Sequence, residues 1–444
     1  MVEAIHKQAT PYPNTKYAWY VTSLLGLVFI LAYVDRYILS LLIQPIKTSL
    51  DLTDFQIGLL IGPAFVVLFV TIGLPIGWLV DRKRRTIILT TGIAVWSIMT
   101  AACGLASSFA TLFLARVGVG IGETTVSPCA ISLIADYFPK ESRPRAIALF
   151  MLGAPAGAGV TYIIGGQVVE MIAAAPPLVL PLVGELFAWQ TAFLLVGLPG
   201  LVAAFVLWLT VREPHRQERL HDAAAGPTLS DAVSYIRTNR AAYFAVLVGA
   251  ASNTGIAVIS FWTPALYERT WGWGVGQSGL MIGGILIVGG LIGTLGSGWI
   301  AARLIARGVH HAPYYTVLGG SLLLAPFAML YPLMPSAELA SVMLFFAIIG
   351  TSASAATSPS CIIAITPGEL RGLATAMFYF AVNLLGALIA PPVVGIVTDW
   401  MGAPEDLKYA MVIVAFGFSI VMLGVLVFGL ASFKRSAAER AAAG

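Results

Sequence analysis

Twelve apolar stretches, each about long enough to cross a lipid bilayer, occupy almost all of this 444-residue chain. The hydrocarbon core of a bilayer is about 30 Å thick, and a helix needs roughly 20 residues to cross it. Backbone groups that face lipid must bond within their own segment, so each stretch is predicted to be a helix. The predicted spans are residues 18–43, 55–80, 86–106, 109–136, 144–171, 188–211, 241–267, 276–302, 313–333, 338–366, 370–397 and 406–432.

The composition excludes an ordinary soluble protein. The chain is 58% hydrophobic and only 10% charged, whereas soluble domains carry roughly 25% charged residues. The net charge of +4 is small and gives no reason to expect a nucleic-acid partner. The three cysteines, Cys103, Cys129 and Cys361, fall within predicted spans, where they are expected to pack as small apolar residues. We therefore expect no disulfide, no metal site and no cofactor.

Basic residues gather in one set of loops. The opposite loops carry only Lys47, Arg269 and Lys408. The positive-inside rule places the basic loops in the cytoplasm, together with both termini of an inner-membrane protein. The basic loop and terminal residues are Arg82, Lys83, Arg84, Arg85, Lys140, Arg143, Arg145, Arg212, Arg216, Arg219, Arg237, Arg240, Arg303, Arg307, Arg371, Lys434, Arg435 and Arg440.

The spans divide into six and six at the longest polar break, residues 212–240. A capping-box spacing from Thr228 to Asp231 predicts a short surface helix there. Pro139, Glu141, Arg143 and Ala146 recur 228 residues later as Pro367, Glu369, Arg371 and Ala374. This repeat favours an internal duplication, as in alternating-access carriers. The predicted parts are a cytoplasmic tail (1–17), a six-helix bundle (18–211), a cytoplasmic linker (212–240), a second, pseudo-symmetric six-helix bundle (241–432) and a cytoplasmic tail (433–444).

Ionisable residues interrupt two predicted spans. Asp35 and Arg36 lie in the first span, and Arg116 and Glu123 lie in the fourth. Charge at this depth costs a few kcal/mol and marks ion or substrate pathways. Asp35, Arg36 and Arg116 fall roughly 10–12 Å below the outer boundary, and Glu123 lies about 10 Å deeper on the helix face of Arg116. We hypothesise that Asp35 and Glu123 bind protons, with Arg36 and Arg116 as switching partners or anion-binding groups. The alternative is a fixed ion-pair network that only holds helices together.

The segment GWLVDRKRRT, residues 77–86, forms the cytoplasmic loop between spans two and three. Gly77 would permit close helix contact. Asp81 could face the positive N-terminus of span eleven, near Glu369, and Arg85 could reach Asp136. These contacts predict a cytoplasmic gate, whereas the alternative is a basic cluster that only sets topology. The proposed gating set is Gly77, Asp81, Arg82, Arg85, Asp136 and Arg143.

The second half has no acid or base in the middle of a span. Its main neutral cavity candidates are Asn253, Trp262, Tyr379 and Asn383. A charged first half and an apolar, aromatic second half suit an amphiphile whose polar head meets Arg36, Arg116 and Glu123. In the first half, the small residues of GAPAGAG, residues 153–159, indicate either a hinge or tight helix packing.

Three segments carry a family resemblance. They are AYVDR (32–36), RVGVGIGETTVSP (116–128) and SLIADYFPKESRPRAIALF (132–150). With the loop at 77–86, the whole chain resembles the major facilitator superfamily, and residues 32–159 resemble its Spinster family of lysolipid and sphingolipid transporters. The resemblance implies that Asp35 and Glu123 are proton-coupling acids and that Arg36 and Arg116 are their partners near the substrate. The chain departs from the family pattern at Arg84, where glycine is usual, and at Thr124 and Thr125, where smaller residues are common.

These observations predict a monomeric, proton-coupled secondary carrier of lysolipid- or sphingolipid-like amphiphiles that works by alternating access in the membrane. Organic anion:cation symporters of the same superfamily carry similar motifs, so a proton-coupled carrier of small organic anions such as sugar acids is the alternative. A drug exporter is a third possibility. An enzyme is not expected, because the sequence has no HExxH or GxSxG motif, and it has no Walker-type loop for ATP.

Overall fold

The computed structural model describes residues 12–139, 141–181, 183–216, 229–309, 311–367 and 370–443. In these residues, twelve helical segments are long and apolar enough to cross a membrane, which confirms the prediction of twelve spanning helices. The structure adds a small antiparallel ribbon in the loop between spans five and six, where Val179 pairs with Glu185 and Leu180 with Gly184. Gly184 has a φ of +90°, a backbone conformation that glycine adopts without strain.

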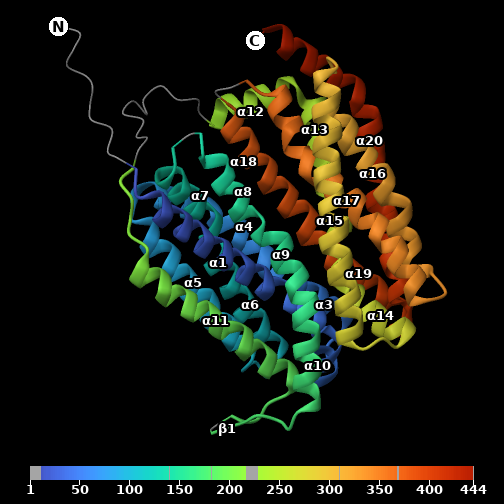
Figure 1. The fold of residues 1–444 in the computed structure, drawn as a ribbon. Helices are drawn as coiled ribbons and strands as arrows, with labels where there is room; N and C mark the ends of the chain where they lie inside the picture. The colour runs from blue at the N-terminus through green and yellow to red at the C-terminus, as the bar shows by residue number, and fades with distance from the viewer. Residues whose placement is uncertain are drawn as a thin grey trace. The chain divides into compact units, whose positions relative to one another are not determined.

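In its described residues, the first half of the chain contains thirteen helices and strands and one π-helical turn, η1. They are α1 (Thr15–Leu41), α2 (Ile43–Leu50), α3 (Asp54–Ile61), α4 (Pro63–Arg82), α5 (Arg85–Cys103), α6 (Phe109–Glu123), α7 (Val126–Tyr137), α8 (Arg143–Met151), α9 (Gly153–Val160), η1 (Thr161–Gly165), α10 (Gly166–Ala174), β1 (Val179–Leu180), β2 (Gly184–Glu185) and α11 (Ala188–Thr210), as labelled in part in Figure 1.

In its described residues, the second half contains nine α-helices, three short 3₁₀ turns and one π-helical turn, η6. They are α12 (Leu229–Thr238), α13 (Arg240–Ile259), η3 (Ser260–Trp262), α14 (Thr263–Trp271), α15 (Val275–Ala306), α16 (Ala312–Leu330), η4 (Tyr331–Leu333), α17 (Ala337–Ile365), α18 (Arg371–Val382), η6 (Asn383–Ala387), α19 (Leu388–Met401), η7 (Pro404–Asp406) and α20 (Leu407–Ala443). The helix α12 is the short linker helix that the capping-box spacing predicted, and Thr228 itself lies outside the described residues.

The chain forms two compact units that do not follow its two sequence halves. The first unit is drawn from Met1–Arg36, Leu68–Ala158 and Pro177–Ala225. The second is drawn from Tyr37–Val67, Gly159–Pro176 and Gly226–Gly444. The segments around α2, α3 and α10 therefore belong to the same unit as the helices of the second half.

The fourth span is broken beside one of its charged residues. Helix α6 ends at Glu123 and α7 begins at Val126. The hydroxyls of Thr124 and Thr125 donate to the carbonyls of Gly120 and Gly122, at 2.7 and 2.8 Å. Such bonds compete with the helical ladder and bend helices. The break therefore lies directly after the carboxylate that the sequence predicted near the midplane.

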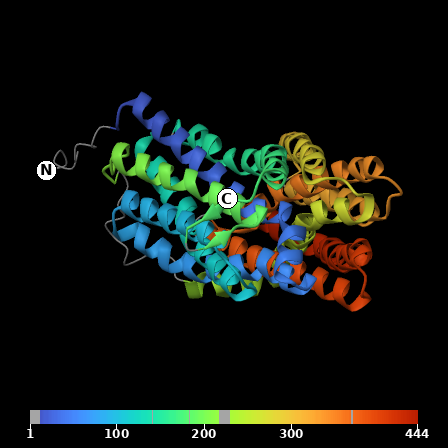
Figure 2. The same ribbon diagram turned by 90° about the horizontal axis from the view of Figure 1, so that it is seen from below.

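Glycines let the helices of the first unit pack backbone to backbone. Helices α5 and α6 are in contact, and α5 also lies side by side with α11 in both views (Figure 1 and Figure 2). At Gly153 and Gly157 of α9, an added Cβ would lie within 2.9 Å of the carbonyls of Gly26 and Ile30 on α1. The small residues of α9 thus serve tight packing in this conformation.

Replacing Gly122 by alanine is expected to destabilise the protein and to disturb the neighbouring Glu123. A Cβ at Gly122 would lie 2.5 Å from the carbonyl oxygen of Gly92 and 2.6 Å from the amide nitrogen of Trp96. Backbone atoms cannot change rotamer to avoid the clash, so α6 would have to move away from α5. We expect this to lower the free energy of unfolding by about 1–3 kcal/mol. Thermal unfolding in detergent measures the loss. Gly77→Ala is the matched control, because a Cβ there meets no described atom within 4 Å.

Candidate functional site

Four ionisable side chains meet in the first unit. Helix α1 carries Asp35 and Arg36, and α6 carries Arg116 and Glu123. Asp35, Arg116 and Glu123 are buried, with 2%, 1% and 3% of their surface exposed. The side chain of Arg36 keeps 26% of its surface exposed. Arg36 is therefore the member of this group that reaches furthest from the buried interior.

Each arginine has a different partner. Arg36 Nη2 donates to Glu123 Oε2 at 2.7 Å, and its guanidinium lies 4.9 Å from the ring centre of Tyr33 and 5.6 Å from that of Phe69. A cation over aromatic rings is held by their electron-rich faces. Arg116 Nη1 donates to the backbone carbonyl oxygen of Asp35 at 3.2 Å. The predicted residues thus come together, with Glu123 paired to Arg36.

Both buried acids keep one oxygen without a hydrogen-bond partner. Within the described part of the chain, these atoms are Asp35 Oδ1 and Glu123 Oε1. Trp96 and Thr100 of α5 lie beside Asp35, and Trp96 Nε1 and Thr100 Oγ1 have no partner in hydrogen-bond geometry among the described residues. Buried polar atoms are nearly always bonded, so such exceptions need an explanation, and proton exchange is one. Trp96 and Thr100 looked like ordinary core residues in the sequence.

At the predicted gate, Arg85 is buried and binds two acids. Arg85 Nη1 contacts Asp136, as the sequence predicted, and Arg85 Nε donates to Glu213 at 2.7 Å. Arg85 also donates to the carbonyls of Ser132 and Pro214, at 3.0 and 3.2 Å. Glu213 was not predicted, although it is an acid placed directly after the sixth span. Arg85 therefore joins the ends of α5, α7 and α11 within the first unit.

The pKa of Glu213 is lowered by its partners. Burial alone would raise this pKa, but the backbone amide of Thr86 and the guanidinium of Arg85 stabilise the ionised carboxylate and outweigh burial. The amide and hydroxyl of Thr86 each lie 2.9 Å from Glu213 Oε2. Glu213 is thus an anion held at the start of α5, where the helix N-terminus also favours negative charge.

The remaining gating candidates do not join this cluster. Asp81 and Arg82 are exposed, and the Arg82 guanidinium lies over the ring of Trp78 at 4.4 Å. The close helix contact expected at Gly77 is not formed in this conformation, because no described atom lies within 4 Å of a Cβ placed there.

Arg143 Nη2 donates to the carbonyl of Ala135 at 2.7 Å, within its own unit. Glu369, the suggested neighbour of Asp81, lies outside the described residues.

In the second unit, the four neutral candidates differ in burial. Asn253 and Trp262 are buried, and Asn253 Oδ1 and Trp262 Nε1 have no hydrogen-bond partner within the described residues. Tyr379 is 50% exposed. The Asn383 amide donates to the carbonyl of Tyr379 at 2.8 Å, one helical turn away. Of the four neutral candidates, Asn253 and Trp262 are therefore the two that have a buried polar atom without a hydrogen bond to a described residue.

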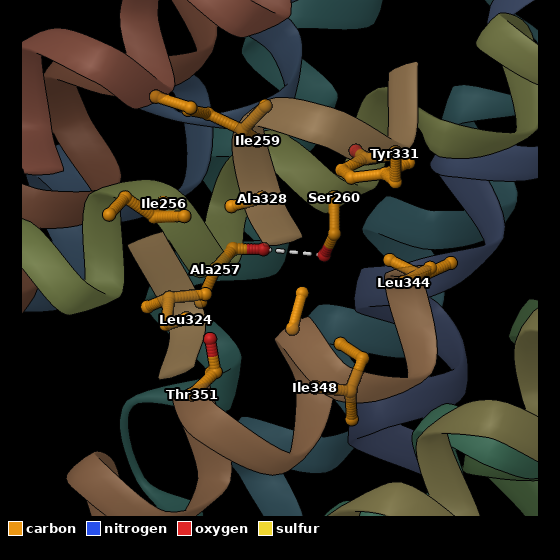
Figure 3. A pocket seen from close by; sticks show the side chains of 12 residues that line it. Ile256, Ala257, Ile259, Ser260, Leu324, Ala328, Tyr331, Leu344, Ile348 and Thr351 are labelled. Carbon is orange, nitrogen blue, oxygen red and sulfur yellow. Dashed lines mark hydrogen bonds between the residues drawn. The ribbon is translucent and has the colours of Figure 1, made fainter. Parts of the chain in front are cut away.

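An apolar pocket lies in the second unit between helices α13, α16, α17 and α20 (Figure 3). The side chains of Ile256, Leu324, Leu344 and Ile348 line it. Ser260 also lines it, but its hydroxyl is bonded to the carbonyl of Ala257, shown as the dashed line. The free volume is about 20 Å³, which is room for about one water molecule. The pocket is therefore apolar and, in this conformation, narrow.

Comparison with known proteins agrees with this architecture. The family model of the Major Facilitator Superfamily matches residues 25–391. An MFS-type efflux pump of Mycolicibacterium smegmatis is 29% identical over 445 residues, which covers 96% of this chain and 95% of that protein. Protein spinster homolog 1 of Xenopus tropicalis is 26% identical over 444 residues, which covers 92% and 80%. A probable L-galactonate transporter of Escherichia coli K12 is 24% identical over 328 residues, which covers 70% and 68%.

Solved structures share the fold. The crystal structure of a bacterial homologue of the human lysosomal transporter Spinster, inward-facing and unoccupied, superposes with a TM-score of 0.79. It is 24% identical in sequence and covers 96% of this chain and 98% of its own. The extent of the family match and the twelve helices lead to one conclusion: the chain belongs to the Major Facilitator Superfamily and is a Spinster-like, multi-pass membrane transporter.

Proposed function

We propose that the protein is a proton-coupled secondary transporter of lysolipid- or sphingolipid-like amphiphiles that works by alternating access as a monomer in the inner membrane. The pairing of Glu123 with Arg36 carries this proposal. The Glu123 carboxylate is buried, one of its oxygens is bonded to a partly exposed arginine, and the other has no partner among the described residues. Such a carboxylate can bind a proton and release the arginine. This change links proton binding to a change in the site, which coupling of proton and substrate movement requires.

The amphiphile assignment rests on chemical asymmetry and on the Spinster relatives. The first unit holds the charged cluster, in which Arg36 and Arg116 can bind an anionic or zwitterionic head. The second unit supplies an apolar pocket around Ile256 and Leu324. An alkyl chain gains free energy in such surroundings in proportion to the area it buries. Because the pocket is narrow in this conformation, its helices would have to separate to admit a chain.

Two other substrate classes have specific support. The Escherichia coli relative is named a probable L-galactonate transporter, and two arginines beside an acid also suit a sugar acid. The Mycolicibacterium relative is named an efflux pump, which favours drug export. Both alternatives keep the same fold and the same charged cluster, so only substrate specificity separates them from the leading proposal.

Reconstitution into liposomes with an imposed pH gradient tests the proposal. We expect labelled lysophospholipid to move in response to the gradient, and long-chain amphiphiles to compete while hexuronates do not. Competition by hexuronates alone would instead establish the sugar-acid carrier, and movement of cationic drugs alone would establish the exporter. Protein-free liposomes report passive flip of the lipid, and liposomes with the Glu123→Gln variant report movement through the carrier that is not driven by protons.

A further inference from the structure

The segment before the sixth span is an apolar β-hairpin. Residues 175–187 read APPLVLPLVGELF, and Glu185 is the only charged residue among them. Strands β1 and β2 pair across the segment, and the amide of Leu186 donates to the carbonyl of Leu178 at 2.9 Å. We call residues 177–187 the apolar hairpin. Its ribbon, labelled β1, lies outside the helices of the first unit (Figure 1).

The side chains of the apolar hairpin are not packed against the protein. Leu178, Val179, Val183 and Phe187 are 43%, 62%, 52% and 53% exposed. Apolar surface gains free energy when it leaves water, and a contiguous exposed patch of it marks a contact with a partner or a membrane. The hairpin therefore presents a surface that the first unit itself does not cover.

The base of the hairpin is fixed to two helices of the same unit. Leu186 is buried, and the amide of Phe187 donates to Gln190 Oε1 at 2.9 Å. Gln190 Nε2 in turn donates to the carbonyl of Ala106, just after α5, at 2.9 Å, and the residue is only 7% exposed. These bonds join the hairpin to the adjacent ends of α5 and α11. Its apolar side chains are thus held in a defined place.

The hairpin continues the apolar surface of a spanning helix. Along α11, the exposed side chains of Leu195, Leu198, Val202 and Phe205 recur every three to four residues and form one stripe. On a helix that crosses a membrane, such a stripe faces the acyl chains of the lipid. Phe187 is exposed and directly precedes this helix. The lipid-facing surface of α11 therefore runs on into the hairpin without a polar boundary.

The backbone and the single charge set the depth. Pro176, Pro177 and Pro181 have no N–H, and the amide of Val183 donates to the carbonyl of Leu180 at 3.3 Å within the turn. Few backbone donors thus need water, which favours apolar surroundings. Glu185 is exposed at the base, opposite Val179, and a carboxylate belongs at the level of the lipid head groups. Both features suit the boundary between head groups and acyl chains.

We propose that the apolar hairpin lies in the membrane interface, on the side opposite the basic loops, with lipid covering Val179, Val183 and Phe187. The other end of α11 leads to Arg212, one of the basic loop residues, so the hairpin belongs to the opposite leaflet. Amphipathic segments at such an interface are immersed by about 5–10 Å. A partner protein suits the patch less well, because protein interfaces carry a polar rim and this surface continues into lipid instead.

Fluorescence quenching in lipid nanodiscs tests the proposal without any substrate. Val179→Cys and Val183→Cys are labelled with a nitrobenzoxadiazole dye in phosphatidylcholine nanodiscs, and the parent protein, whose three cysteines are buried, gives the blank. We expect lipids with a nitroxide close to the head group to quench the dye at both positions, and quenching by aqueous iodide to be largely lost. Ser107→Cys, exposed in the polar loop between α5 and α6, is the matched control and should show the opposite pattern.

A charge in the turn tests whether lipid contact is the cause. Val183→Asp, combined with the dye at Val179→Cys, should restore quenching by iodide, because a carboxylate favours water over the acyl boundary. Val183→Ala removes apolar area without adding charge and should keep the dye shielded. Gel filtration shows that each variant is folded before it is measured. Shielding from iodide that persists in Val183→Asp overturns lipid contact as the cause.

Two other results also overturn the proposal. Iodide quenching at Val179 and Val183 as strong as at Ser107 would show that the hairpin lies in water. Shielding from iodide without quenching by nitroxide lipid would show that protein covers the hairpin, and cross-linking through Val179→Cys would then identify a second copy. The assay contains no substrate and no pH gradient, so its result stands whether or not the protein transports lysolipid.

Discussion

Replacing Glu123 by glutamine is expected to abolish accumulation driven by a pH gradient while leaving substrate exchange at equal pH. Each pH unit is worth 1.36 kcal/mol, so one coupled proton and a gradient of about two units can sustain about a 100-fold concentration ratio. Glutamine retains the shape of the side chain and its bond to Arg36 through the carbonyl oxygen, but it cannot bind and release a proton. The ratio in the variant should therefore fall to about 1.

The contacts of Glu123 explain why we choose it before Asp35 as the proton-coupling residue. Glu123 is bonded to Arg36 at 2.7 Å and lies at the break between α6 and α7. Protonation of Glu123 would release Arg36, whose side chain is already partly exposed and could then bind an anionic head group. In the described residues no arginine forms an ion pair within 4.0 Å with the Asp35 carboxylate, which lies near Arg116, Trp96 and Thr100. Asp35→Asn is therefore expected to slow transport through the same cluster and not to abolish coupling.

Glu170→Gln changes an exposed acid of the fifth span in the same way and should transport normally. Exchange of labelled for unlabelled substrate at equal pH shows that Glu123→Gln is folded and binds substrate. Proton-driven accumulation that persists in both Glu123→Gln and Asp35→Asn would remove the coupling role from this cluster and leave it as a set of packing contacts.

The sequence predicted which charged residues come together, because their depth and helix face follow from helix geometry alone. Rise per residue and span boundaries put Asp35, Arg36 and Arg116 at one depth and Glu123 on the face of Arg116. The pairing was not predictable, because the choice between Arg36 and Arg116 as the partner of Glu123 depends on side-chain rotamers and on the aromatic rings beside Arg36. The break after Glu123 was not predictable either, because it depends on the hydroxyls of Thr124 and Thr125 donating to carbonyls of their own helix.

The Asp54–Arg269 and Arg85–Glu213 ion pairs could not be predicted from the sequence, for a different reason. Each is formed by residues more than a hundred positions apart, such as Asp54 with Arg269 and Arg85 with Glu213. No period or spacing records such contacts in one sequence, and each residue alone looks like an ordinary loop charge. The Arg85–Asp136 pair was predictable, because both residues lie at the same end of predicted neighbouring spans.

Replacing Arg85 by methionine is expected to cause the largest loss of stability. Arg85 is 1% exposed and holds Asp136 and Glu213 together at the ends of three helices. Removing one member of a buried ion group leaves its partners charged and unpaired, at a cost of about 3–5 kcal/mol. At a fixed scan rate in detergent, the midpoint of thermal unfolding should fall by about 10 °C. Arg84→Met, at the exposed neighbouring position, should change it little.

Neutralising the acids tests the cause. If unpaired charge is responsible, adding Asp136→Asn and Glu213→Gln to Arg85→Met should recover most of the loss, because no buried charge then lacks a partner. A triple variant as unstable as Arg85→Met would mean that the arginine acts through packing.

The free energy of unfolding is expected to depend on pH with a defined sign. Because the folded-state pKa of Glu213 is lowered, its contribution is present above the ordinary glutamate pKa of about 4.3 and is lost as the pH falls through the lower folded value. The stabilities of the parent protein and of Arg85→Met should therefore converge on acidification, and their continued separation at low pH would assign the difference to contacts that carry no charge.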